Sequence, residues 1–130
     1  MKDVKPGVKA SVQKQVEFED SAAALGNEGI KVLSSPAMIL LMELASAKVL
    51  TPYLEEDERT VGIAFDIRHM APTPVGMNVV ASSELVETSG IKFKFHVEVL
   101  DDMEKIGEGT ISMAVIKMER FLEGAISKKL

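Results

Sequence analysis

The clearest pattern in the chain is the apolar run from Ala37 to Leu50, where nearly every residue is hydrophobic or small. A run that is apolar on all sides predicts a helix covered on both faces. Ser35 suits the N-cap, and Pro36 suits the first helical position, where no intrahelical N–H bond is needed. Pro52 predicts the end of the helix or a kink.

The second half of the chain alternates with a period of two, which predicts four strands separated by turns. The turns are expected at 71–76 ("APTPVG"), 88–90 ("TSG") and 101–109 ("DDMEKIGEG"). Residues 55–59 ("EEDER") are expected to form a solvated turn before the first of these strands. The apolar positions are Val61, Ile63, Phe65 and Ile67; Met77, Val79 and Ala81; Ile91, Phe93, Phe95, Val97 and Val99; and Ile111, Met113 and Val115.

Residues 9–18 predict one further strand, residues 19–34 an irregular or partly helical connection, and residues 119–130 a short final helix. Sequential hairpins give an antiparallel sheet, and the apolar helix covers one of its faces. The fold class is therefore α+β: an antiparallel sheet of about five strands wrapped round one long central helix, which is the hot-dog architecture. Residues 1–130 are expected to form a single domain. Open sheet edges and the uncovered part of the helix predict a homodimer and leave a tetramer open.

Composition narrows the function. The net charge of −5 argues against nucleic acid as the partner, and the absence of cysteine excludes thiolate catalysis and Cys-ligated metal sites. No signal-peptide core is visible at the start, and the apolar stretch 36–45 is too short to span a bilayer. A cytoplasmic protein without membrane contact is expected.

Glu43 lies in the middle of the apolar helix. A carboxylate in an apolar setting is costly unless it is paired, so its presence there points to general-base chemistry. The alternative is that its head group reaches solvent or a neighbouring Lys or Arg.

Three stretches together resemble a known family: "SSPAMILLMELASAKVLTPYL" at 34–54, "GIAFDIRHMAPTPVGM" at 62–77 and "GEGTISMAVIKMERF" at 107–121. They are similar to the hot-dog acyl-CoA thioesterases, in the branch of the fluoroacetyl-CoA thioesterase. The resemblance runs from about residue 32 to residue 121.

The resemblance implies three catalytic residues and one substrate contact. Ser35 falls on a hydroxyl residue before the helix, Glu43 on the helix carboxylate, and His69 on the histidine that ends the next strand. Gly62 falls where the family has a glycine beside the acyl group. Ser35 replaces a threonine, and residues 28–32 lack an aromatic residue of the fluoroacetyl enzyme, so fluoroacetyl selectivity is not predicted.

Each of these residues has an ordinary alternative. N-capping alone explains Ser35, with Ser34 a candidate for either task, and a turn histidine explains His69. As a catalytic group, His69 has a near-neutral pKa that suits proton transfer to a thiolate. His96, on the polar phase of a strand, receives no role.

The start of the helix is expected to bind the substrate carbonyl. Free N–H groups from Ala37 onward carry partial positive charge, whereas Pro36, beside them, has no N–H. Ser35 and Glu43 lie eight residues apart, about 12 Å along a helix at ~1.5 Å per residue. Either the substrate spans both groups or a second chain supplies one of them.

The predicted activity is hydrolysis of a small acyl-CoA to free acid and coenzyme A, with no metal and no further cofactor. Glu43 either activates water or attacks to form an anhydride. The alternatives are a non-catalytic acyl-CoA-binding module and, ranked lower, a hot-dog hydratase or dehydratase. Candidate contacts for the coenzyme A phosphates are Arg68, Lys92, Lys94, Lys117 and Arg120.

Overall fold

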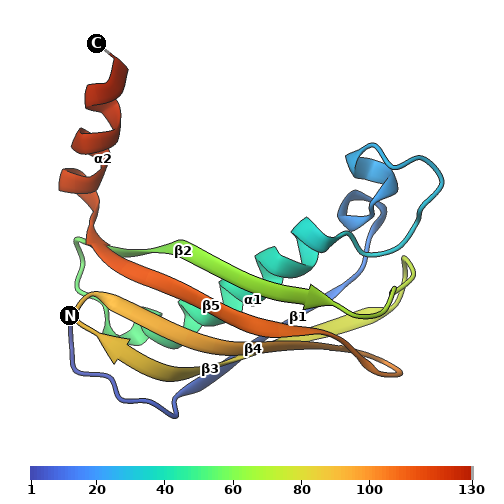
Figure 1. Ribbon diagram of the computed structural model, residues 1–130, viewed down its shortest axis with the longest axis horizontal. Coiled ribbons are helices and arrows are strands. Elements are labelled where there is room, and N and C mark those ends of the chain that lie inside the picture. The colour runs from blue at the N-terminus through green and yellow to red at the C-terminus, as the bar shows by residue number, and fades with distance from the viewer. Residues whose placement is uncertain (130) are drawn as a thin grey trace.

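The computed structural model describes residues 1–129 and shows five strands and two α-helices (Figure 1). In chain order the elements are β1 (Lys9–Gln15), α1 (Ser35–Leu50), β2 (Glu58–His69), β3 (Asn78–Ser89), β4 (Lys92–Asp101), β5 (Lys105–Lys117) and α2 (Met118–Ile126). Single 3₁₀ turns occur at Phe18–Asp20, Ala23–Leu25, Thr51–Tyr53 and Ser127–Lys129.

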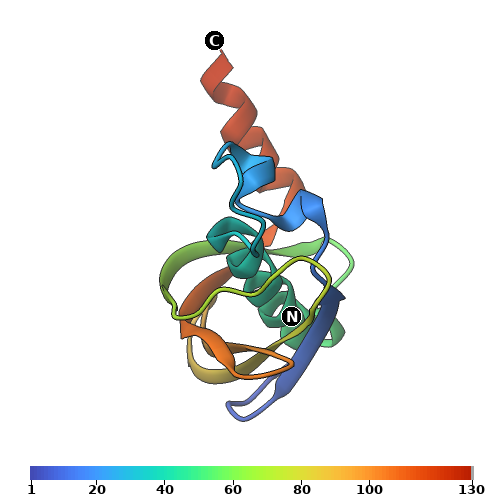
Figure 2. The ribbon, with the colours of Figure 1, turned by 90° about the vertical axis from the view of Figure 1, so that its right-hand side faces the viewer.

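The strands form one antiparallel sheet in the order β1-β3-β4-β5-β2. The sheet curls round α1, as the end-on view shows, and every strand contacts this helix (Figure 2). The predicted α+β arrangement of a five-stranded sheet around a long helix is confirmed. β1 and β2 are the two edge strands, and β2 has an unpaired edge.

The core lies between α1 and the concave face of the sheet. Met38, Met42 and Val49 are buried against strand residues that include Phe95 and Ile111. Aliphatic and methionine side chains therefore fill most of the interior, in agreement with the low aromatic content of 5%. One side of α1 is not covered, however, since Leu40 and Leu44 are about half exposed (54% and 48%).

The alternation expected along β2 is wrong in one place. The register shifts between Gly62, which pairs with Met113, and Ala64, which pairs with Ser112, so Ile63 forms a β-bulge. Since side chains of a strand alternate between faces, the extra residue reverses the phase. Val61 therefore lies on the opposite face from Phe65, Ile67 and His69, while Gly62 shares the helix-facing side with them.

Element boundaries differ from the expectation at two turns. The predicted turn 101–109 is shorter, because β5 begins at Lys105 and its Ile106 is fully buried. Glu58, expected in a solvated turn, is buried at the start of β2. It accepts a hydrogen bond from the Glu55 N–H (2.8 Å) and lies 3.1 Å from the amino group of Met1.

The predicted final helix is confirmed over Met118–Ile126, and Leu130 lies outside the described residues. α2 projects away from the sheet, beyond β2 (Figure 1), and none of its residues is buried. Within residues 1–129, neither helix combines the length and hydropathy that a membrane span requires.

Candidate functional site

The two serines at the start of α1 have different roles: one caps the helix and the other contacts His69. Ser34 is the N-cap: its backbone is extended, and its Oγ accepts a hydrogen bond from the Ala37 N–H at 3.2 Å. Ser35 is already helical and exposed, so Pro36 is the second helical residue and the predicted cap at Ser35 is wrong. The N-cap interaction leaves the Ser35 hydroxyl free for other contacts.

Ser35 uses that freedom to meet His69 at the end of β2. Its Oγ lies 2.7 Å from His69 Nδ1, a strong hydrogen bond that joins the start of α1 to the end of the strand. His69 pairs with Gly107 of β5, on the helix-facing side of the sheet. A Cβ at Gly107 would lie 2.6 Å from the sulfur of Met38, so the glycine lets the helix pack closely there.

Burial has two effects on the His69 imidazole. It lowers the pKa of His69 below its ordinary value of 6.5, with partial opposition from the backbone at Ala71, so the ring is neutral at neutral pH. The second ring nitrogen, Nε2, is buried and has no hydrogen-bond partner within residues 1–129. Leaving a buried polar atom unpaired costs about 1–3 kcal/mol, and a bound ligand that pairs with the atom removes this cost.

Glu43 lies halfway along α1, partly buried, and its carboxylate faces Gly62. A Cβ built on Gly62 would lie 2.9 Å from Glu43 Oε2 and 2.5 Å from the ring of Phe65. The absence of a side chain at Gly62 therefore lets the carboxylate approach the strand. Among the described residues, the Glu43 carboxylate forms no hydrogen bond or ion pair, so the alternative of a neighbouring Lys or Arg partner is not found.

Within one chain, Glu43 is separated from the Ser35–His69 pair. Ser35 and Glu43 are about 12 Å apart along the helix, at ~1.5 Å per residue. Gly62, which Glu43 faces, and His69 are six ladder steps apart because Ile63 is bulged, roughly 20 Å at ~3.3 Å per residue. One chain thus presents two half-sites at different points along α1 and β2.

An apolar surface surrounds Glu43 and was not predicted as part of the site. Leu40 and Leu44 from α1, and Ile63 and Phe65 from β2, are all between 44% and 54% exposed. They lie beside the free edge of β2. Their residue types are those of a core, and only the bulge and the missing cover on α1 show that they form a surface.

The helix-start amides differ from the expectation. Ala37 was expected to offer a free N–H, but that group is taken by Ser34. Pro36 has no N–H, and the Met38 N–H donates to the Ser34 carbonyl at 3.0 Å. For the Ser35 N–H, no acceptor is found in the described part of the chain, so it is the amide available beside His69.

The candidate phosphate-binding cations are scattered rather than grouped. Arg68, Lys92 and Lys94 are exposed. The residues paired with them on the neighbouring strand place all three on the outer face of the sheet. Lys117 is within ion-pair distance of Asp57 and Glu58 (3.4 and 3.6 Å), whereas Arg120 lies on α2. In residues 1–129 no three His, Asp or Glu side chains cluster as metal ligands would, and the absence of a metal stays a prediction.

Separate serine substitutions test the division of tasks between Ser34 and Ser35. Ser34→Ala should lower the free energy of unfolding by about 1 kcal/mol, because it removes the N-cap, and should leave the His69 contact in place. Ser35→Ala should leave stability nearly unchanged but weaken any activity that depends on His69. Thermal unfolding and thioester turnover of both variants measure this, and equal stability losses would contradict it.

Comparison with known proteins identifies the family. Residues 16–119 match the family model described as FlK, fluoroacetyl-CoA-specific thioesterase. The chain belongs to the FlK thioesterase family. It is 36% identical over 91 residues to the fluoroacetyl-CoA thioesterase of Streptantibioticus cattleyicolor, a match that spans 70% of this chain and 66% of that protein.

Solved structures agree with membership of the FlK family. The structure of the fluoroacetyl-CoA thioesterase FlK is similar over 97% of this chain and 98% of its own, with 29% identity and a TM-score of 0.93. A thioesterase superfamily member from Thermus thermophilus covers 98% of this chain and 94% of its own, with 26% identity and a TM-score of 0.88. A hot-dog-like protein from Thermanaerovibrio acidaminovorans, 18% identical with a TM-score of 0.85 over 96% of this chain and 92% of its own, shares the fold.

Proposed function

We propose that the protein hydrolyses the thioester of a small acyl-CoA to the free acid and coenzyme A. The observation that carries this is the match to the thioesterase family over residues 16–119, a range that contains the Ser35–His69 pair and Glu43. A variant of the fluoroacetyl-CoA thioesterase FlK, 30% identical to this chain, has been solved with fluoroacetate and CoA bound. Its structure covers 91% of this chain and 99% of its own, with a TM-score of 0.87.

The site is completed by a second copy of the chain in a homodimer. Antiparallel pairing of two β2 strands satisfies the free edge of each and covers the apolar surface of Leu40, Leu44, Ile63 and Phe65. A pairing centred on Asp66 of each copy, with Ile63 left out of the ladder as the bulge, sets His69 of one copy opposite Gly62 of the other on the helix-facing side. Glu43 of the second copy, which faces its own Gly62, then lies beside the first copy's Ser35–His69 pair.

Hydrolysis in this site needs a base for the attacking water, a hydrogen-bond donor for the departing sulfur and a hydrogen-bond donor for the carbonyl oxygen. The Glu43 carboxylate takes a proton from water, whose oxygen bonds to the thioester carbon as the C–S bond breaks. Neutral His69, which Ser35 holds in place through Nδ1, donates a hydrogen bond from Nε2–H to the departing sulfur. The proton that Glu43 took from the water passes to the thiolate, so both side chains return to their starting states. The Ser35 N–H, at the positive end of α1, donates to the carbonyl oxygen as negative charge develops there.

A second route has Glu43 attack the thioester directly to form a mixed anhydride, which water then hydrolyses. Both routes use the same residues and give the same products. As proposed, neither route uses a metal, and coenzyme A enters as part of the substrate. Cytoplasmic location remains an expectation.

The function is tested by thiol release from a panel of acyl-CoAs that includes acetyl-, fluoroacetyl-, branched and aromatic substrates. We expect turnover of small acyl groups, because the Phe65 ring and Glu43 fill the space next to Gly62. No preference for fluoroacetyl-CoA is expected. Tight binding of acyl-CoA with no release of thiol would instead support the non-catalytic binding module.

A further inference from the structure

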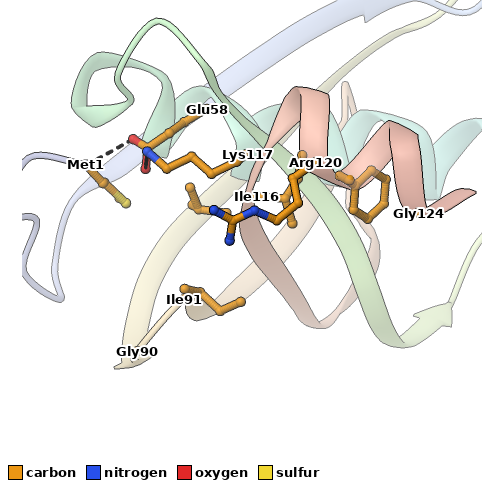
Figure 3. Close-up of a pocket in the computed structure, with 10 residues that line it drawn as sticks. Met1, Glu58, Gly90, Ile91, Ile116, Lys117, Arg120 and Gly124 are labelled. Carbon is orange, nitrogen blue, oxygen red and sulfur yellow. Dashed lines mark ion pairs between the residues drawn. The ribbon is translucent and has the colours of Figure 1, made fainter.

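α2 presents an apolar face that nothing in its own chain covers. Phe121, Leu122, Ala125 and Ile126 recur at helical spacing on one side, and all four are exposed. A groove of about 640 Å³ runs between the base of α2 and the rest of the chain, lined by Ile91, Ile116 and Phe121, with Lys117 and Arg120 at its side (Figure 3). Ile91, predicted to lie in a strand, is in the β3–β4 turn and is 61% exposed.

The connection between β1 and α1 has the complementary properties. Its 3₁₀ turns expose Phe18 and Leu25, and Ile30 is exposed after them. Residues 17–30 carry four carboxylates and no Lys or Arg. Within this segment Glu19 and Glu28 are exposed and form no ion pair with residues 1–129.

The charges of the α2 region are opposite in sign. Residues 117–129 carry four cations (Lys117, Arg120, Lys128 and Lys129) against two carboxylates. In the described chain no carboxylate lies within ion-pair distance of Arg120. The chain thus holds an acidic apolar segment and an apolar helix with cations at both of its ends, of which Lys117 is already paired with Asp57 and Glu58.

These two elements lie at opposite ends of β2 but on the same side of the sheet. α2 follows Lys117, whose strand partner is Glu58 at the start of β2. Residues 31–33 bond to residues 73–75, just beyond the end of β2. Both rise past β2 in Figures 1 and 2. Antiparallel pairing of two β2 strands exchanges the ends, so α2 of each copy meets residues 17–30 of the other.

We infer that the groove under α2 binds residues 17–30 of a second copy of this chain. The inference rests on the β2 pairing of the proposed function. Residues 17–34 lead directly into Ser35 and so border the site of their own copy. By binding residues 17–30, α2 of the second copy holds this border in place. Each active site therefore takes its carboxylate and its outer cover from the same neighbouring chain.

Cross-linking tests the contact, and the cysteine-free chain is a suitable background. The double variant Leu25→Cys/Phe121→Cys is treated with a short bismaleimide. The two positions in one chain lie beyond opposite ends of β2, whose 12 residues span roughly 36 Å at ~3.3 Å per residue, so a link within one chain is excluded. We expect a covalent dimer in high yield at a protein concentration where light scattering shows dimers.

The matched control is Leu25→Cys/Val86→Cys. Val86 is exposed on β3 towards the same end of the sheet as α2, but away from β2, and should give no covalent dimer. Dimers that do not cross-link through Leu25→Cys/Phe121→Cys, or that cross-link equally in the control, would overturn the α2 contact. A chain that is monomeric by light scattering would overturn the β2 pairing as well. Cross-linked dimers without thiol release would leave the contact standing and refute the proposed activity.

Discussion

Glu43→Gln is expected to lower thioester turnover by about 10²–10⁴-fold while the dimer still forms, because the amide cannot accept the proton of the attacking water. The substitution keeps the size of the side chain, so its close approach to Gly62 remains. Glu98→Gln, on the outer face of β4, is the matched control and should keep full turnover. Full activity of Glu43→Gln would refute both routes proposed for this residue.

Mixing two inactive variants shows which chain supplies Glu43. If the site combines His69 of one copy with Glu43 of the other, a heterodimer of Glu43→Gln and His69→Gln contains one intact site and one with both substitutions. Random re-association should then restore about a quarter of the wild-type activity, since half of the dimers are mixed and each has one intact site of two. Should both groups act within one chain, no mixed dimer has an intact site, and activity stays lost.

His69→Gln is expected to lower kcat/KM by about 10²–10³-fold and to remove the acid limb of its pH profile. Burial lowers the pKa of His69, so in the wild type this limb should lie below pH 6.5, where the ring becomes protonated. His96→Gln is the control, because the chain has only two histidines and His96 is exposed on β4. An acid limb that persists in His69→Gln and disappears in His96→Gln would reject the assignment.

The free energy of unfolding should also depend on the protonation of His69. The pKa of His69 is lower in the folded chain than its ordinary 6.5, so between those two values the unfolded chain binds the proton more readily. The wild-type free energy of unfolding should therefore fall as pH drops below 6.5, and this loss should be smaller in His69→Gln. Glu58, whose pKa the Glu55 N–H lowers from 4.5, contributes a separate loss at more acid pH. Denaturant unfolding at pH 7, 6 and 5 measures the His69 loss, and a further measurement at pH 4 adds the Glu58 loss.

The fold was predictable from periodicity because its strongest signals were local. The apolar run of α1 and the alternation of β3 and β4 depend on neighbouring residues alone, and these elements appear as expected except that Ile91 lies in the turn before β4. The end of β4 and the start of β5 were harder, since Lys105–Gly109 are rich in polar residues and Gly that also suit a turn. There, pairing with β4 and β2 decides the structure.

The candidate site was predictable only in part. The apolar helix pointed to Glu43 and the family resemblance to Ser35 and His69, and the structure brings the last two into contact. The choice of Ser34 over Ser35 as the cap depends on which residue takes the first helical dihedral angles, and two adjacent serines give no local preference. The amide that remains free follows from that choice. The exposed apolar surface had no signal of its own, because its residues are those of a core.

The bulge at Ile63 limits where relatives of this protein can gain or lose a residue in β2. Gly62 and His69 are seven residues apart, an odd number, so only the extra residue lets both face α1. An insertion of one more residue between Ala64 and Arg68, without a second bulge, would turn the imidazole to the outside of the sheet. Loss of Ile63 would instead remove the bulge and keep both residues on the inside with their partners on β5 unchanged. Evolutionary deletions are therefore expected at that position before insertions anywhere between it and the histidine.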